Sequence, residues 1–231
     1  MIEGIDISHW SGAIDWPVVR TQENVQFVIA KCTEATTFLD STWKINRDQC
    51  LKLGIPFGAY HFYRHYGNPD AQAAWFLQNL GVKNIPVICD TETTDTSGTK
   101  LSDDVKRFCE ILKAAGYKVG IYSARYFLKA WFSTASWAAD YPLWIANYGV
   151  TAPLIPYPWS NYGAWGANPR VPIWQYSDKG TVIGVPELGV DVNYWSTAAG
   201  DLYKWFGNGY PYSTEPEPTP EPVSGLRLVV T

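Results

Sequence analysis

Short apolar runs of strand length alternate with helical patterns along most of this chain of 231 residues. This alternation is typical of an α/β architecture in which helices connect parallel strands and pack over them. The expected strands are 2–8, 25–33, 55–63, 85–92, 119–123, 143–147, 172–177 and 190–194. Eight is a number at which a sheet closes on itself. The sequence therefore predicts a TIM-like β/α barrel.

The helical patterns become less regular in the second half of the chain. The expected helices are 16–22, 41–53, 69–80, 102–115, 124–132 and 197–206. Gly54, Gly81 and Gly116 each follow a helical run directly, as C-terminal caps do. The stretch between 147 and 172 is rich in Pro, Gly and Trp and has no helical period. We therefore expect about five regular β/α units, followed by strands that loops connect.

The composition changes near Gly207, where a run rich in Pro and Glu begins. Such a run cannot bury a core and behaves as an extended spacer. The prediction is a barrel over 1–207 and a Pro/Glu-rich linker over 208–222. The remaining residues, 223–231, alternate like the first strand of a truncated second module or form a tail.

Charge and aromatic content narrow the classes of ligand. The net charge of −4 lacks the basic excess that nucleic-acid-binding proteins carry, and no apolar run is long enough to span a membrane. We expect neither as a partner, and we expect a monomer. Aromatic residues make up 16% of the chain, with 12 Trp and 15 Tyr. Because this exceeds what core packing needs, we expect a cleft lined with flat rings on which sugar rings stack.

The tripeptide Asp90-Thr91-Glu92 ends one of the apolar runs. Side chains alternate along a strand, so Asp90 and Glu92 point the same way, roughly 7 Å apart. Two neighbouring buried carboxyls cannot both ionise cheaply, so the pKa of one rises while that of the other stays low. This asymmetry suits acid-assisted cleavage of a glycosidic bond.

Two more carboxylates are expected at the same place. Asp6 lies near the end of the first predicted strand and Asp191 lies in the eighth. The first and last strands become neighbours when a barrel closes, and chemistry collects at the C-terminal ends of parallel strands. We therefore expect Asp6 and Asp191 side by side, facing Asp90 and Glu92 across one cleft.

Six short motifs occur in order along the chain. They are Gly4-Ile-Asp-Ile-Ser8, Lys31-Cys-Thr-Glu34, Gly58-Ala-Tyr-His-Phe62, Asp90-Thr-Glu92, Trp174-Gln-Tyr176 and Val190-Asp-Val-Asn193. Together they resemble the lysozymes of glycoside hydrolase family 25, also called Chalaropsis-type muramidases, from Ile2 to about Phe206. The chain carries Cys32 and Ala35 where the family usually has Ala and Gly, which bears on the loop conformation rather than on the chemistry.

The resemblance implies an N-acetylmuramidase that cuts the β-1,4 bond between N-acetylmuramic acid and N-acetylglucosamine in bacterial peptidoglycan, without a cofactor. It implies that Glu92 is the general acid and that Asp90, Asp6 and Asp191 assist. The positions that match the family's substrate-binding cleft are Tyr60, Phe62, Tyr122, Trp144, Tyr148 and Gln175. It also implies action outside the cell. The start of the chain is not a secretory signal, so we expect a phage endolysin-like protein or a secreted one.

The stereochemical course stays open. The 2-acetamido group of the sugar could attack its own anomeric carbon while Asp90 orients it, which retains the configuration. A water activated by an aspartate across a wider gap would invert it.

Other polar groups are interpreted as structural. Lys31 and Glu34 are expected to form an ion pair. His61 and His65 lie four apart where a strand gives way to a loop, so no metal site is expected. The four cysteines, Cys32, Cys50, Cys89 and Cys109, are interpreted as small buried hydrophobic residues.

Two alternatives compete with a lysozyme. A chitinase-like β-1,4-N-acetylglucosaminidase also uses an Asp-x-Glu strand end, but it carries a longer acidic run before that motif, where this chain has the apolar 86–89. A non-catalytic wall-binding barrel predicts the loss of at least one carboxylate, and all four are present.

Overall fold

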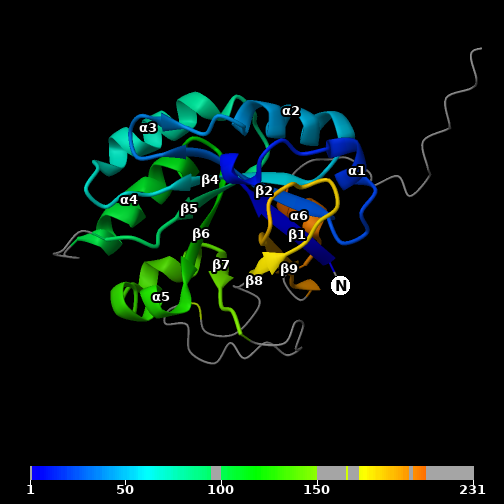
Figure 1. Cartoon of the computed structure of the whole chain (residues 1–231). Coiled ribbons are helices and arrows are strands. Elements are labelled where there is room, and N and C mark those ends of the chain that lie inside the picture. The colour runs from blue at the N-terminus through cyan, green and yellow to red at the C-terminus, as the bar shows by residue number, and fades with distance from the viewer. Residues whose placement is uncertain (1, 95–99, 150–164, 166–171, 198–199, 207–231) are drawn as a thin grey trace, which may run out of the picture.

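The computed structural model describes residues 2–94, 100–149, 165, 172–197 and 200–206 (Figure 1). The strands are β1 (Ile2–Ile7), β2 (Phe27–Glu34), β3 (Phe38–Leu39), β4 (Phe57–Phe62), β5 (Pro86–Asp90), β6 (Lys118–Ala124), β7 (Leu143–Ala146), β8 (Ile173–Gly180) and β9 (Val190–Trp195). The α-helices are α1 (Trp16–Arg20), α2 (Trp43–Leu53), α3 (Pro69–Leu80), α4 (Leu101–Ala114), α5 (Arg125–Trp131) and α6 (Leu202–Phe206). Two short 3-10 helices are η1 (His9–Ser11) and η2 (Ser136–Asp140). No helix in these ranges is long and apolar enough to cross a bilayer.

The sheet closes into the predicted barrel. Its strands follow the order β1-β9-β8-β7-β6-β5-β4-β2, and parallel pairing of β1 with β2 joins the two ends. The short β3 was not predicted and adds to β2 as an antiparallel partner. Five strands, β1, β2, β4, β5 and β6, are each followed by a helix, which confirms the expected regular first half. The predicted linker and tail lie outside the described residues, as does most of 147–172.

The direction of the last strand differs from the prediction. The site was expected at the C-terminal ends of parallel strands, Asp191 of the eighth strand included, whereas β9 runs antiparallel to both β1 and β8. The reason is the connection: 181–189 contains no helix, and a short loop can join only antiparallel neighbours. The start of β9, rather than its end, therefore lies beside the end of β1.

Side-chain alternation separates the barrel interior from the layer between sheet and helices. The interior at the start of the strands is filled by rings, including Phe27, Trp195 and Phe206. Gly4 faces this region, and a Cβ there would lie 2.5 Å from the Phe27 carbonyl oxygen, so only glycine fits. The outer layer forms a larger cluster under the helices, several of which lie along one side of the sheet (Figure 1).

Helix α6 closes the barrel at the end where the parallel strands begin. Phe206 lies 5.4 Å from Phe27 between ring centroids and 6.3 Å from Trp195. The Lys118 ammonium, at the start of β6, donates to the Lys204 carbonyl oxygen. The opposite end, where β1, β5 and β6 finish, stays open for chemistry.

The cysteine prediction is confirmed, because all four cysteines are buried with free thiols. Burial raises the pKa of Cys32, Cys50 and Cys89 well above the usual range, so these thiols stay protonated.

The structure also answers the question raised by Ala35. Its φ is +50°, in the left-handed region that L-residues avoid. This conformation costs a residue with a Cβ roughly 1–2 kcal/mol, which glycine would not incur. The loop keeps the shape that glycine would favour, and Ala35 bears the strain.

We predict that Ala35→Gly increases the free energy of unfolding by about 0.5–1 kcal/mol, because relief of strain exceeds the entropy that glycine adds to the unfolded chain. Urea unfolding measures the change. The matched control is Ala114→Gly at the end of α4, which should lower stability by roughly 0.5–1 kcal/mol. A loss of stability in Ala35→Gly would contradict the strain argument.

Candidate active site

A cleft of about 260 Å³ opens at the C-terminal ends of the parallel strands. All four carboxylates singled out in the sequence line it. The lining residues are Asp6, Ile7, Ser8, Trp10, Ser11, Lys31, Tyr60, Phe62, Asp90, Glu92, Tyr122, Trp144, Gln175, Glu187 and Asp191. The structure thus brings together residues from both ends of the chain.

Strand register positions each pair of carboxylates. Asp6 stands directly opposite Asp191 in the antiparallel pairing of β1 with β9. Asp90 is the last residue of β5, and Glu92 lies two residues beyond it, so the expectation that the strand extends to residue 92 is wrong. The backbone nevertheless stays beside β6, because the Thr91 N–H donates to the Tyr122 carbonyl oxygen at 2.9 Å. The same alternation therefore carries Glu92 to the cleft.

The cleft floor orients Asp6 through two amide side chains. Gln175 Nε2 donates to Asp6 Oδ2 at 2.9 Å, and Asn193 Nδ2 donates to the same oxygen at 2.7 Å. The Gln175 carbonyl oxygen in turn accepts from the hydroxyls of Tyr122 at 2.7 Å and Tyr148 at 2.6 Å. In each of these four hydrogen bonds the donor lies farther from Asp6 than the acceptor, or donates to Asp6 itself. The network therefore favours the ionised form of Asp6.

Trp144 has a structural role as well as a place in the cleft. Its side chain is 3% exposed and its indole Nε1 donates to Asn193 Oδ1 at 2.7 Å. Its ring packs 4.4 Å from that of Tyr122. Trp144 therefore belongs to the wall that fixes the Asp6 network, and little of its surface is exposed to the cleft.

The other predicted cleft residues divide into two groups. Tyr60, Phe62, Tyr122 and Gln175 line the cleft together with the carboxylates. Tyr148 does not; it lines a neighbouring cavity of about 410 Å³ beside α5 and reaches the site through its hydroxyl on Gln175.

Burial raises the pKa of all four carboxyls. Desolvation, opposed by the bonds from Asn193 and Gln175, brings the pKa of Asp6 to about 6. Desolvation and the nearby Asp6 raise the pKa of Asp191 to about 8. The pKa of Asp90, which is 5% exposed, rises well above its usual range through burial and the Glu92 charge. Burial also raises the pKa of Glu92, although Lys31 and Arg64 oppose that shift.

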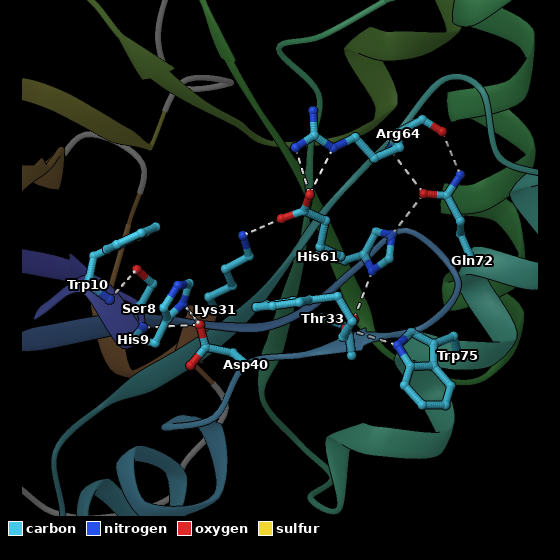
Figure 2. Close-up of polar contacts among 12 residues, drawn as sticks. Ser8, His9, Trp10, Lys31, Thr33, Asp40, His61, Arg64, Gln72 and Trp75 are labelled. Atoms are coloured by element: carbon cyan, nitrogen blue, oxygen red, sulfur yellow. Dashed lines mark hydrogen bonds and ion pairs between the residues drawn. The ribbon is translucent and has the colours of Figure 1, made fainter. Parts of the chain in front are cut away.

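The expected ion pair of Lys31 and Glu34 is present and extends into a larger cluster (Figure 2). The Lys31 ammonium donates to Glu34 Oε2 at 2.6 Å, and Arg64 donates twice to Glu34 Oε1, at 2.6 and 2.9 Å. Lys31 also lines the cleft. The pair is therefore structural and also places a cation beside the catalytic candidates.

Buried polar groups hold Arg64 in place from behind (Figure 2). The Arg64 N–H donates to Gln72 Oε1 at 2.9 Å, and Gln72 Nε2 donates to the Arg64 carbonyl oxygen at 2.8 Å. His61 lies between Gln72, at 3.2 Å, and the Thr33 hydroxyl, at 2.8 Å. Burial lowers the pKa of His61 to about 4, so a neutral ring donates to Gln72 and accepts from Thr33.

Sequence reasoning missed six lining or network residues. They are Ile7, Ser8, Trp10, Ser11, Glu187 and Asn193. Asn193 could have been found, because it shares a face with Asp191 two residues before it. Ser8, Trp10 and Ser11 follow β1 directly, which was a usable signal; nothing in the sequence marked Glu187.

Comparison with known proteins gives consistent results. Residues 5–185 match the family described as Glycosyl hydrolases family 25. Lysozyme M1 of Streptomyces globisporus is 32% identical over 220 residues, which cover 87% of this chain and 70% of the relative. An autolytic lysozyme of Clostridium acetobutylicum is 30% identical over 187 residues, covering 80% of this chain and 53% of that longer protein. The crystal structure of the bacterial lysozyme from Streptomyces coelicolor superposes with a TM-score of 0.75 at 31% identity, covering 90% of this chain and 97% of that one.

The raised pKa of Asp191 predicts how stability depends on pH. Its ordinary value is 3.8 and its folded value is about 8, so between these values the folded state holds a proton that the unfolded state has lost. This contribution to stability is complete below about pH 4 and disappears as pH rises through 8. In Asp191→Asn, the melting temperature should therefore fall less between pH 5 and 8.5 than in the wild type.

Thermal melts across that range make the measurement. The matched control is Asp103→Asn, which changes an exposed carboxylate on α4 and should keep the wild-type slope. An equally steep decline in Asp191→Asn would show that Asp191 titrates alike in the folded and unfolded states.

Proposed function

This chain belongs to glycosyl hydrolases family 25, and on that premise we propose that Glu92 gives the proton to the leaving oxygen of the glycosidic bond. The chain is a peptidoglycan-hydrolysing lysozyme that acts on the cell wall. The bond we assign to it is the β-1,4 bond between N-acetylmuramic acid and N-acetylglucosamine. The observation that supports the assignment is the convergence of four carboxyls with raised pKa values on one open cleft.

Glu92 suits the role of general acid better than Asp90 does. It is half-buried at the cleft, whereas Asp90 lies almost fully buried at the end of β5. Burial raises the pKa of Glu92, and the cations Lys31 and Arg64 limit the rise. A donor needs a pKa near the working pH, high enough to hold the proton and low enough to release it.

Asp90 is positioned to act on the sugar's acetamido group. Its Oδ1 is buried and has no hydrogen-bond partner among the described residues. Such an oxygen is costly unless a ligand satisfies it. We assign it the substrate N–H. That bond and the positive charge of the developing ring favour the ionised form of Asp90, whereas burial favours the proton in the free enzyme. This arrangement supports the substrate-assisted, retaining course over the inverting one.

Asp6 is assigned to charge stabilisation, whereas Asp191, whose pKa of about 8 keeps its carboxyl protonated below that pH, adds negative charge only once it ionises. Asp6 receives two amide donors and is thereby fixed in orientation before the substrate arrives. Preorganised negative charge stabilises an oxocarbenium-like transition state without reorganisation during the reaction. No observation on the described residues favours the chitinase-like alternative or the non-catalytic barrel.

We predict that Glu92→Gln lowers kcat on peptidoglycan by about 10²–10⁴-fold, because the side chain keeps its shape but cannot donate the proton. Reducing ends released from cell walls measure the rate, and an unchanged melting temperature shows that the variant folds. Glu23→Gln is the matched control, since Glu23 is exposed and does not line the cleft, and it should keep the activity of the wild type. Wild-type turnover in Glu92→Gln would exclude Glu92 as the acid.

The division into a catalytic barrel over 1–207, a linker and a further module or tail is also our proposal. The described elements support it as far as α6, whose Phe206 packs on the barrel interior. We predict that truncation after Gly207 leaves kcat and KM on soluble glycan fragments within about 2-fold, because all lining residues of the cleft in the described part of the chain precede it. Loss of folding on truncation, seen in thermal melts, would show that residues beyond 207 belong to the barrel.

A further inference from the structure

Trp10 differs from the other aromatic side chains that line the cleft. It is 76% exposed, whereas Tyr60 and Phe62 are half-buried and Tyr122 and Trp144 are buried. An exposed indole at the edge of a cleft offers a large apolar face, which gains free energy when a ligand covers it and it leaves water. Trp10 therefore stands at the cleft as an unused contact surface.

The backbone around Trp10 is fixed. Trp10 belongs to η1, the short helix that follows β1, and its N–H donates to Ser8 Oγ at 3.2 Å. The Ser8 N–H donates in return to Ser11 Oγ at 3.3 Å, which completes a capping box. The helix thus holds Trp10 three residues beyond the end of β1, close to the catalytic carboxylates.

The indole ring also has a supported neighbour (Figure 2). The His9 ring lies 4.6 Å from the Trp10 ring between centroids. Asp40 anchors His9 twice, through the His9 N–H at 3.0 Å and through Nδ1 at 2.8 Å from the same carboxylate oxygen. Asp40 is itself buried and accepts from Thr42 at 2.7 and 2.9 Å. Because the support is built in advance, binding on Trp10 loses little conformational entropy.

The cleft is too small to hold a whole glycan strand, so the strand needs further contact surface outside it. Its volume of about 260 Å³ lies below the roughly 300–1,000 Å³ of sites that enclose a small ligand. A glycan strand is a polymer, so most of it must lie outside this volume, over the rim. Trp10 is the strongly exposed aromatic side chain among the lining residues, and it is continuous with the cleft.

We propose that Trp10 forms an outlying saccharide subsite, in which its indole face stacks on a sugar ring of the glycan strand beyond the pair that is cleaved. The proposal rests on the assignment of the cleft to peptidoglycan. A sugar ring suits the site better than the peptide stem, whose carboxylates would enter a cleft lined by acidic side chains, among them Asp6 and Glu187. The apolar C–H face of a pyranose matches a flat ring without needing charge.

The test compares glycan length in Trp10→Ala. On long, peptide-free glycan strands its KM should rise about 3- to 10-fold with kcat unchanged, as expected for the loss of one aromatic contact. On the shortest fragment that the enzyme still cleaves, KM and kcat should equal those of the wild type. Trp10→Phe, which keeps a ring, should lie close to the wild type on both substrates.

The matched control is Tyr126→Ala, because Tyr126 is 73% exposed but lines the neighbouring cavity instead of the cleft. It should change neither KM. Binding of both glycans to Glu92→Gln and to its Trp10→Ala double variant, measured by calorimetry, separates affinity from chemistry. A calorimetric loss confined to long strands supports the subsite.

Three outcomes would overturn the proposal: an equal rise of KM on long and short glycans, no rise on either, or a rise that appears only when strands carry peptide stems. The last would make the stem the occupant. Failure of the proposed function looks different, since Glu92→Gln would then stay active whatever Trp10→Ala does. If Trp10→Ala lowers the melting temperature, the comparison is read from Trp10→Phe against Trp10→Leu at equal stability.

Discussion

The pairing of β1 with both β2 and β9 is the constraint on which the rest of the molecule depends. One strand joins the first and last parts of the sheet, parallel on one side and antiparallel on the other. Closure leaves the barrel without the long exposed edges that invite aggregation. It also sets Asp6 against Asp191, which no local segment of the chain could bring together. The cleft is therefore a product of closure as much as of the residues that line it.

Four carboxyl groups close together at the open end of the barrel lower the stability of the folded state. The surrounding polar groups offset this cost in two ways. Donors arranged in series through Gln175 and Asn193 stabilise Asp6. A cation held by Glu34 faces Asp90 and Glu92 from another strand. Ring packing in the lower barrel supplies the apolar burial that such a site cannot supply for itself. Stability and reactivity are thus divided between the two ends of one barrel.

The sequence predicted the features that rest on a repeated pattern, and it did not predict those that rest on a single loop, turn or side-chain contact. All eight barrel strands were predicted, because hydrophobic alternation repeats in each of them. The direction of β9 was not, since it depends on a single loop. The approach of Gln175 to Asp6 depends on side chains from strands far apart in the chain. The exposure of Trp10 depends on a capped turn that has no periodic signature. The strain at Ala35 was signalled only as a departure from the family's motif.

The position of α6 has a practical consequence for anyone who wishes to tether this enzyme. Phe206 lies at the end of the barrel opposite the carboxylates, against the first residue of β2. A bead or a carrier protein attached just after Phe206 would lie at the end of the barrel that α6 closes. An immobilised enzyme of this kind would turn its open end outward, and an insoluble polymer could reach the cleft without passing the support.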